Sequence, residues 1–296
     1  MLGRLRSAFT KYRGISAPFY MQSEIRRAIN NRRSLDCAQR IRDEKKSMLA
    51  LETLAAIHHL AGSRHGPIVE IGSYVGGATL AILDATKERG NIVISIEFGV
   101  SYDHPEIPTK DSVADLRKNV SLWGLDDERL IILPGWTLEA WLVGNILLGL
   151  SGNRADMLVI DSDGFAERDF LYLHPLLNDG AALVFDDYMS SASAKSDKVA
   201  PFVDDMVSKS VFRNSAMLPW GTWFGHLERR PAQDDIAPYI KKWREAKWPW
   251  VDFLDLQKRE QHIATAKDLK VPLLPFQFVR SGGQDELAAY AKVKPT

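Results

Sequence analysis

The stretch that decides the fold is Ile68-Val69-Glu70-Ile71-Gly72-Ser73-Tyr74-Val75-Gly76-Gly77, a short β-rich segment that runs into a glycine-rich turn. An amphipathic stretch over 77–87 follows directly. An apolar run that ends in glycines and leads into a helical pattern predicts the first strand, turn and helix of a βαβ unit. Three glycines in the turn permit positive φ angles and let a ligand approach the backbone closely.

Beyond this unit, short apolar runs alternate with amphipathic stretches as far as Leu227. This alternation is typical of βαβ units around a parallel sheet whose strands are covered by helices on both faces. We expect five parallel strands, at 68–71, 92–96, 130–133, 157–160 and 181–185. We expect helices at 77–87, 112–122, 138–148, 168–177 and around 201–208.

Two more strands are expected near 213–218 and 222–227, with only Pro219, Trp220 and Gly221 between them. So short a connection predicts an antiparallel hairpin. The predicted fold class is therefore α/β: a doubly wound, mostly parallel seven-stranded sheet with a C-terminal antiparallel hairpin, plus helical N- and C-terminal extensions.

We expect one compact domain in three parts: an N-terminal helical arm over 1–66, an α/β core over 67–228 and a C-terminal extension over 229–296. Residues 1–40 carry nine Lys and Arg against two acids. We interpret this arm as a solvated basic helix. An organellar transit peptide, or a patch for an acidic partner or membrane surface, is the alternative.

Composition excludes several classes of protein. Lys plus Arg and Asp plus Glu both number 38, so the zero formal charge removes the whole-chain electrostatic argument for nucleic-acid binding. The longest apolar stretch, 141–150, is shorter than the roughly 20 residues of a membrane-spanning helix. We expect no nucleic-acid partner and no membrane span, and the sequence leaves open whether the chain forms a homo-oligomer.

Cysteine and histidine usage gives a second set of exclusions. Cys37 is the single cysteine, which excludes an internal disulfide and a Cys-based zinc cluster and predicts a cytoplasmic protein. His58 and His59 are neighbours on an expected helix, so their side chains point about 100° apart and cannot easily share a metal ion. We interpret both histidines as structural.

The first two strand ends indicate a nucleoside-containing cofactor. Glu97 stands at the end of the second expected strand, where a carboxylate can accept hydrogen bonds from both hydroxyls of a ribose. The turn 72–77 lacks the spacing of the dinucleotide fingerprint, and no Gly-Lys-Ser/Thr follows it. Glu70 would repel a pyrophosphate but suits an ammonium or a sulfonium. These features favour S-adenosylmethionine.

The last two parallel strands end in carboxylates. Asp161 and Asp163 follow one strand, and Asp186 and Asp187 follow the next. Because neighbouring parallel strands end at one edge, Asp161, Asp186 and Asp187 should converge. Acids without Cys or His nearby are hard oxygen ligands, which favours Mg²⁺, Mn²⁺ or Ca²⁺ over zinc.

The motif Val-Glu-Ile-Gly-Ser-x-x-Gly-Gly at 69–77 resembles the first motif of class I S-adenosylmethionine-dependent methyltransferases, especially small-molecule O-methyltransferases. A parallel sheet with a final hairpin is the arrangement expected of that class. The resemblance covers roughly 44–227. It implies that the turn residues, Glu97, the turn 134–137 and the first acid bind the cofactor: Glu70, Gly72, Ser73, Tyr74, Gly76, Glu97, Gly135, Trp136 and Asp161.

The acidic strand ends resemble those of divalent-metal-dependent O-methyltransferases that act on sugars. That resemblance implies Asp161, Asp186 and Asp187 as the ligands of Mg²⁺ or another divalent cation, and Asp163 as the catalytic base. Gly164 stands where the catechol enzymes carry a lysine base, which argues against a catechol acceptor.

We therefore expect an O-methyltransferase that acts on a hydroxyl of a small molecule, with a sugar or polyol favoured over a phenol. One alternative is a metal-dependent glycosyltransferase, because Asp161-Ser162-Asp163 also matches a short Asp-x-Asp motif. The other is a non-catalytic binding protein on the same fold.

Overall fold

The computed structural model describes residues 23–246, except for residues 100, 126–127, 136–145, 147–148, 151, 190–194 and 219–220. Trp136 and most of the helix expected over 138–148 lie outside the described residues. So do the basic residues 1–22 and the segment 247–296.

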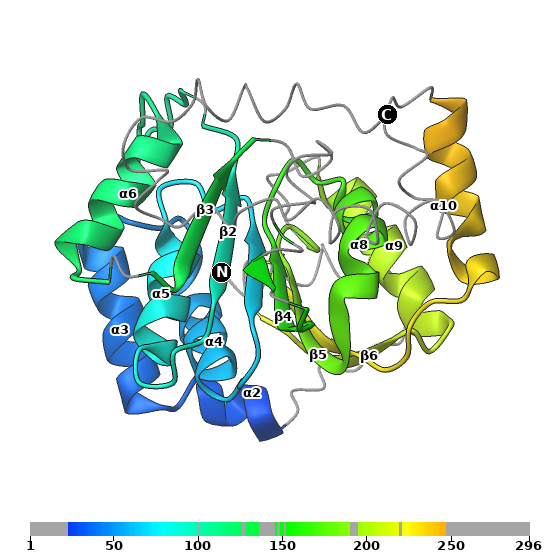
Figure 1. The fold of residues 1–296 in the computed structure, drawn as a ribbon, viewed down its shortest axis with the longest axis horizontal. Coiled ribbons are helices and arrows are strands. Elements are labelled where there is room, and N and C mark those ends of the chain that lie inside the picture. The colour runs from blue at the N-terminus through cyan, green and yellow to red at the C-terminus, as the bar shows by residue number, and fades with distance from the viewer. Residues whose placement is uncertain are drawn as a thin grey trace, which may run out of the picture.

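A seven-stranded sheet in the order β3-β2-β1-β4-β5-β7-β6 forms the centre of the molecule (Figure 1). Its strands are β1 (Ile68–Ile71), β2 (Val93–Glu97), β3 (Leu130–Pro134), β4 (Ala155–Ile160), β5 (Leu177–Phe185), β6 (Phe212–Met217) and β7 (Trp223–Leu227). The first five pair in parallel, while β7 pairs antiparallel with both β5 and β6. The predicted mixed sheet with a terminal hairpin is confirmed.

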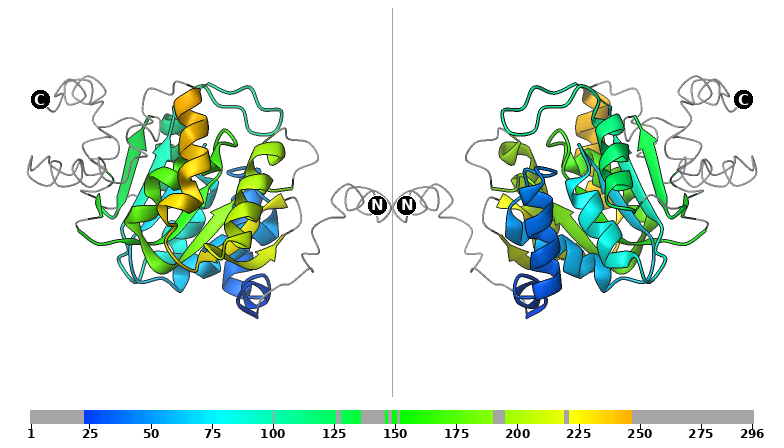
Figure 2. Two further views of the ribbon diagram at one scale, coloured as in Figure 1. Left: turned by 90° about the vertical axis from the view of Figure 1, so that its right-hand side faces the viewer. Right: turned by 90° about the vertical axis from the view of Figure 1, so that its left-hand side faces the viewer.

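Helices cover both faces of this sheet (Figure 1). One layer holds α2 (Ser23–Ala28), α3 (Arg32–Asp43), α4 (Leu51–Gly62), α5 (Gly77–Thr86) and α6 (Ser112–Leu122). The other holds α8 (Ala166–Leu173), α9 (Ser196–Ser208) and α10 (Gln233–Glu245). The side views in Figure 2 show α10 on one side of the molecule and α3 and α6 on the other. Two hydrophobic clusters, one on each face, bury the central strands completely.

The element bounds depart from expectation around two prolines. The helix expected to end at Leu177 ends at Leu173, because Pro175 has no N–H for a further turn; a 3₁₀ turn (His174–Leu176) follows and β5 begins at Leu177. Conversely, α9 begins at Ser196 and continues through Pro201. The proline is exposed, and it removes only one N–H donor from the hydrogen bonds of the helix.

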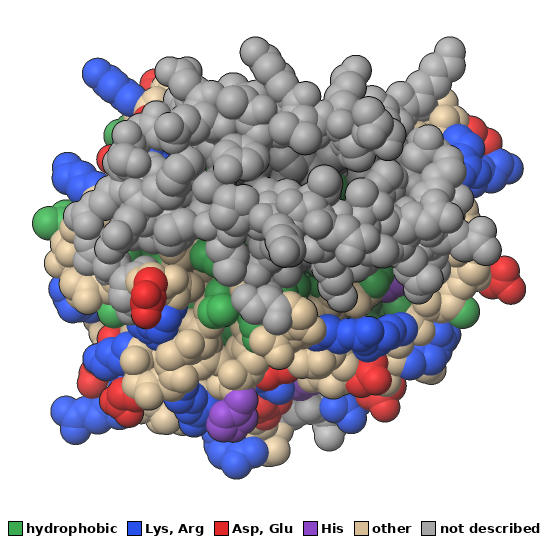
Figure 3. Space-filling view, in the orientation of Figure 1, with side chains coloured by type: hydrophobic (Ala, Val, Ile, Leu, Met, Phe, Trp, Pro, Cys, Tyr) green, Lys and Arg blue, Asp and Glu red, His purple; other side chains and the backbone are tan. Residues whose placement is uncertain are grey.

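The surface carries mixed charge. On the face in Figure 3, Lys and Arg side chains alternate with Asp and Glu over the described residues, as a chain of zero formal charge allows. Among the residues that the structure describes, no helix has the length and apolar character needed to cross a membrane.

The glycine turn after β1 is fixed by protein contacts. Gly72 adopts φ +82°, and a Cβ built there would lie 1.8 Å from the carbonyl oxygen of Asp161. A Cβ on Gly77 would lie 2.3 Å from the Cβ of Ser47, in the connection between α3 and α4. We expected the glycines to leave room for a ligand; at these two positions they leave room for the neighbouring backbone and side chain.

Substituting Gly72 by Ala should therefore be far more damaging than an ordinary glycine substitution. We expect a loss of roughly 3–5 kcal/mol of unfolding free energy, because overpacking adds to the strain of a positive φ. Gly90→Ala is the matched control, since Gly90 has φ +73° and nothing within 4 Å of a built Cβ. Denaturant unfolding measures both variants, and equal losses would refute the close-contact explanation.

Candidate active site at the carboxyl ends of the strands

The sheet reverses its winding at β1, which lies between β2 and β4. In open α/β sheets ligands bind beyond the carboxyl ends of the strands at this switch point. Every described residue that the sequence proposed for the site lies at the carboxyl end of β1, β2, β4 or β5 or in the segment that follows, except Gly135, which follows β3.

The turn between β1 and α5 has an unusual backbone. Tyr74 adopts φ +51° and Gly76 adopts φ +99° as the residue that caps α5. The Tyr74 hydroxyl donates a hydrogen bond to the carbonyl of Ile107. The side-chain amide of Asn119 donates a hydrogen bond of 2.8 Å to the carbonyl of Val75. The turn is thus held in a defined shape by the loop before α6 and by α6 itself.

Glu97 ties this turn to the start of α6. One carboxylate oxygen accepts the backbone N–H of Tyr74 at 2.5 Å, and the other accepts the Ser112 hydroxyl at 2.7 Å. The Glu97 side chain is buried, and its backbone carbonyl accepts the N–H of Gly135 at 2.9 Å. The oxygen bound by Ser112 also accepts the N–H of Gly99 at 3.4 Å, so the oxygen bound by Tyr74 is the one that retains a lone pair for a ligand. The role of Glu97 and Gly135 in cofactor binding stays a prediction.

Glu70 is buried beneath the turn. Its carboxylate accepts the Thr79 hydroxyl at 2.5 Å and the Ser95 hydroxyl at 3.3 Å, and the Ser73 hydroxyl lies against that of Ser95. Burial raises the pKa of Glu70 to about 7 and the Glu97 charge adds to this, although the hydroxyl groups oppose it. A nearby cation would offset this electrostatic penalty.

The three acids after β4 and β5 lie together, as expected from parallel strand ends. One carboxylate oxygen each from Asp161, Asp186 and Asp187 lies within 4.8 Å of the others. Burial and the Asp186 charge raise the pKa of Asp161 well above its usual value, and burial likewise raises that of Asp186. Asp187 adopts φ +58°. Clustered, partly desolvated carboxylates favour a bound cation.

Lys195 is a member of this cluster that the sequence reasoning missed. Its ammonium lies 3.1 Å from Asp187 Oδ2, and its side chain packs over Gly164, where a built Cβ would lie 2.7 Å from the Lys195 Cβ. Burial opposes its charge, but the charges of Asp161 and Asp187 raise the pKa of Lys195. No signal in the sequence identifies Lys195, because Gly164 is compatible with any neighbouring residue.

Asp163 has different partners from the three acids of the cluster. Arg168 makes two hydrogen bonds to it, at 2.9 and 3.1 Å, and the N–H of Phe165 donates to the same carboxylate. Arg168 also binds the fully buried Asp169, which accepts the Ser162 hydroxyl at 3.0 Å. Sequence reasoning missed Arg168, because the pair joins a residue of the turn before α8 to a residue of α8 itself.

Comparison with known proteins gives one family. Residues 69–188 match a family model described as "Methyltransferase domain". No curated protein sequence matches the chain.

Several solved structures are similar in fold. Cofactor-bound Rv0187 from MTB is 17% identical with a TM-score of 0.49, over 68% of this chain and 92% of that one. SAH-bound methyltransferase PaMTH1 from Podospora anserina is 15% identical with a TM-score of 0.47, over 66% and 88%. SAM-bound O-methyltransferase TomG from Streptomyces achromogenes is 16% identical with a TM-score of 0.47, over 66% and 90%.

The burial of Glu70 predicts a pH-dependent stability component. A carboxyl whose pKa rises from 4.5 to about 7 on folding binds its proton more tightly in the folded state. Its contribution to the free energy of unfolding therefore falls as the pH rises from 4.5 through 7. Glu70→Gln removes this loss. Relative to the wild type, we expect the variant to gain about 3 kcal/mol of unfolding free energy between pH 4 and pH 8.

Denaturant unfolding at a series of pH values measures this difference. Glu88→Gln is the control, because the Glu88 side chain is 75% exposed. A Glu70→Gln difference that stays constant with pH would contradict the assignment of a raised pKa to this carboxyl.

Proposed function

We propose that this chain, whose residues 69–188 match a methyltransferase domain, is a class I S-adenosylmethionine-dependent enzyme that methylates a hydroxyl oxygen of a small molecule. We further propose that the acceptor is a sugar or polyol rather than a phenol, that a divalent cation takes part, and that the reaction is cytoplasmic.

One observation carries this proposal: the glycine turn and the acid cluster meet at a single backbone contact. Gly72 lies against the carbonyl of Asp161, and the carboxylate of Asp161 belongs to the cluster with Asp186 and Asp187. A cofactor held at the turn and an acceptor held at the acids would therefore be neighbours. Bringing two reactants together in this way supplies a large part of the rate acceleration of a transfer reaction.

The residues present fit S-adenosylmethionine. Glu70 and Glu97 make the turn acidic, which suits a cationic donor and disfavours a pyrophosphate. We assign Glu70, Gly72, Ser73, Tyr74 and Gly76 to the methionine side, Glu97 to the ribose, Gly135 and Trp136 to the adenine, and Asp161 to the edge nearest the acids. When bound, this cofactor supplies an electrophilic methyl group on a sulfonium.

The residues also fit a hard divalent cation such as Mg²⁺. Asp161, Asp186 and Asp187 offer carboxylate oxygens only, and burial with mutual repulsion raises the pKa of Asp161 and Asp186 in its absence. Asp186 is oriented by the Thr222 hydroxyl, which donates to it at 2.5 Å. When bound, the cation would orient the acceptor hydroxyl and lower its pKa.

We assign Asp163 the role of the base that takes the proton from the acceptor hydroxyl. Its side chain is 45% exposed, and two hydrogen bonds from Arg168 fix its direction, so a substrate can reach a carboxylate that is held in place. Lys195 is a poorer candidate, because its raised pKa keeps it an ammonium at neutral pH. It is better placed to balance the charge of Asp187.

The contacts of Asp163 also weigh against the glycosyltransferase alternative. An Asp-x-Asp cation site needs both acids at one ion, whereas Asp161 lies with Asp186 and Asp163 is paired with Arg168. A binding protein without turnover is the remaining alternative, and the transfer assay below decides it.

Methyl transfer and cofactor binding test the function directly. We expect S-adenosylhomocysteine to raise the thermal unfolding midpoint of the protein. We expect the labelled methyl group of S-adenosylmethionine to pass to members of a polyol pool more than to members of a phenol pool.

Removal of divalent cations tests the role of the metal ion. EDTA should abolish methyl transfer and Mg²⁺ should restore it. Stabilisation by a UDP-sugar with Mn²⁺ alone would favour the glycosyltransferase, and full activity in excess chelator would refute the cation.

Asp163 and Lys195 can be separated by substitution. Asp163→Asn should lower kcat by roughly 10²-fold or more while leaving cofactor affinity unchanged, because only proton transfer is lost. Lys195→Met should tighten Mg²⁺ binding, since an ammonium that competes for Asp187 is removed. Transient kinetics and calorimetric titration measure these effects. The assignment fails if Lys195→Met has the larger kcat defect and Asp163→Asn is near wild type.

A further inference from the structure

Asp186, one of the three acids of the cluster, lies opposite Thr222 in the antiparallel register of β5 and β7. Phe185 of β5 pairs with Trp223 of β7, so the same register places the next residue of each chain segment together. Residues opposite each other in such a pair carry their side chains on one face of the sheet, close enough to interact. The Thr222 hydroxyl contacts Asp186 Oδ1 at 2.5 Å. The strand register therefore brings a hydroxyl group to this carboxylate.

The face of the sheet that carries this contact is the one covered by α4. Asp186 lies two residues after Val184 and therefore on the same face. Val184 and Phe224 belong to the hydrophobic cluster that α4 also joins. Thr53, in the first turn of α4, has its hydroxyl 3.2 Å from that of Thr222. A helix of the N-terminal layer thus extends the contact by one more hydroxyl group.

The number of hydrogens fixes the direction of both hydrogen bonds. An ionised carboxylate can only accept, and threonine has a single hydroxyl hydrogen. Thr222 therefore donates its hydrogen to Asp186 and accepts one from Thr53. Thr53 and Thr222 are 0% and 2% exposed, so water does not compete for either hydroxyl. The two threonines form a chain of hydrogen bonds that ends on the Asp186 carboxylate.

The backbone of the segment after β5 is fixed separately. The N–H of Asp186 donates 3.0 Å to the carbonyl of Ile160 at the end of β4, and the N–H of Met189 donates 3.1 Å to the carbonyl of Gly221. Gly221 has φ +100°, and a Cβ built on it would lie 2.4 Å from the Met189 carbonyl oxygen. Because these contacts hold the main chain, the threonine hydroxyls act on the direction of the Asp186 side chain.

We infer that Thr222 and Thr53 are positioning residues of the cation site. The inference rests on the proposed function, in which Asp161, Asp186 and Asp187 hold a divalent cation. Carboxylates that bind a metal ion are themselves held by hydrogen bonds, and loss of such a partner typically weakens metal binding by about 10- to 100-fold. Thr222 fixes the rotation of the Asp186 carboxylate, and Thr53 fixes the hydroxyl of Thr222.

The energetic role of this pair is preorganisation. A carboxylate that is already held in one rotamer loses little conformational freedom when an ion binds, so a hydrogen-bond donor raises the affinity without contacting the ion. Both threonines lie outside residues 69–188, the span that matches the methyltransferase model. The cation site therefore extends beyond that span, to the N-terminal helical layer through α4 and to the hairpin through the turn before β7.

Direct cation binding tests the inference without an assay of methyl transfer. Mn²⁺ is the probe, because it prefers oxygen ligands and its binding can be followed by electron paramagnetic resonance and calorimetric titration. Thr222→Val keeps the shape of the side chain but removes the hydroxyl, and we expect it to raise the Kd of Mn²⁺ by about 10- to 100-fold. Thr222→Ser keeps the hydroxyl and should retain most of the wild-type affinity.

A double-variant cycle tests the order of the two hydroxyls. Thr53→Val should raise the Kd of Mn²⁺ by about two- to tenfold, because one neutral hydrogen bond is lost. Combined with Thr222→Val it should add nothing, since no hydroxyl remains for Thr53 to orient. Thr86→Val is the matched control and should leave the Kd unchanged: Thr86 is also buried, and its hydroxyl donates 2.8 Å to the carbonyl of Ile82 within α5.

The affinity for S-adenosylhomocysteine separates positioning from a general structural role. Thr222→Val should weaken Mn²⁺ binding and leave the Kd of S-adenosylhomocysteine at the wild-type value, whereas equal losses of both affinities would overturn the inference. If Thr222→Val does not fold, an unchanged Kd of Mn²⁺ in Thr53→Val overturns it instead. Wild-type protein that binds Mn²⁺ no better than Thr222→Val refutes the inference alone. Wild-type protein that binds no Mn²⁺ refutes the cation of the proposed function and the inference with it.

Discussion

The candidate site depends on the close approach of two strand ends. β1 and β4 remain paired to their last residues, and beyond them the N–H of Asp161 donates 2.9 Å to the carbonyl of Ile71. This bond brings the backbone of Asp161 against Gly72, where no side chain fits. A single backbone constraint therefore sets both the shape of the turn and the position of the first acid beside it.

The same constraint concentrates negative charge where burial makes it expensive. Glu70, Asp161 and Asp186 all have pKa values raised by burial, so the folded state carries an electrostatic penalty at neutral pH. Hydroxyl donors and Lys195 relieve part of it. Such a penalty is retained in a fold when a bound cation removes it, which fits a sulfonium at the turn and a metal ion at the acids.

The sequence predicted the strands well because the central ones are buried on both faces and therefore read as continuous apolar runs. It predicted that the acids converge, because parallel strands end at one edge. It could not predict Lys195 or Arg168, whose contacts depend on how a loop and a short helix fold back. It placed the start of α9 near residue 201 rather than at Ser196, because a proline inside the helix is tolerated where tertiary packing supports the turns before it. Trp136 lies outside the described residues.

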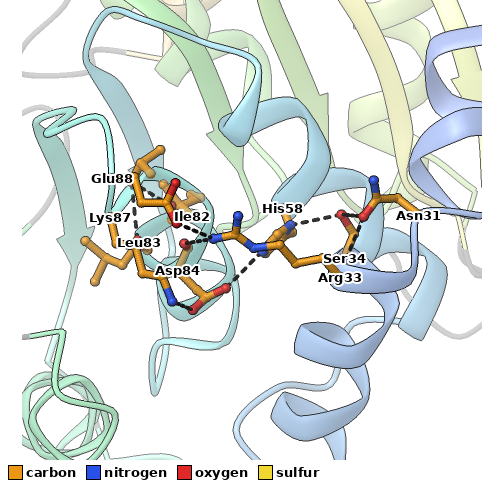
Figure 4. A network of polar contacts seen from close by, with 10 residues as sticks. Asn31, Arg33, Ser34, His58, Ile82, Leu83, Asp84, Lys87 and Glu88 are labelled. Carbon is orange, nitrogen blue, oxygen red and sulfur yellow. Dashed lines mark hydrogen bonds and ion pairs between the residues drawn. The ribbon is translucent and has the colours of Figure 1, made fainter.

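Histidine shows what the structure adds to an interpretation made from the sequence. From the sequence, His58 and His59 are interpreted as structural because their side chains point about 100° apart on one helix. In the structure the buried His58 ring lies between Ser34 of α3 and Asp84 of α5, at 2.9 and 3.1 Å (Figure 4). These contacts join three helices of one layer, and they could not be predicted because residues 34, 58 and 84 are brought together only by the packing of α3, α4 and α5.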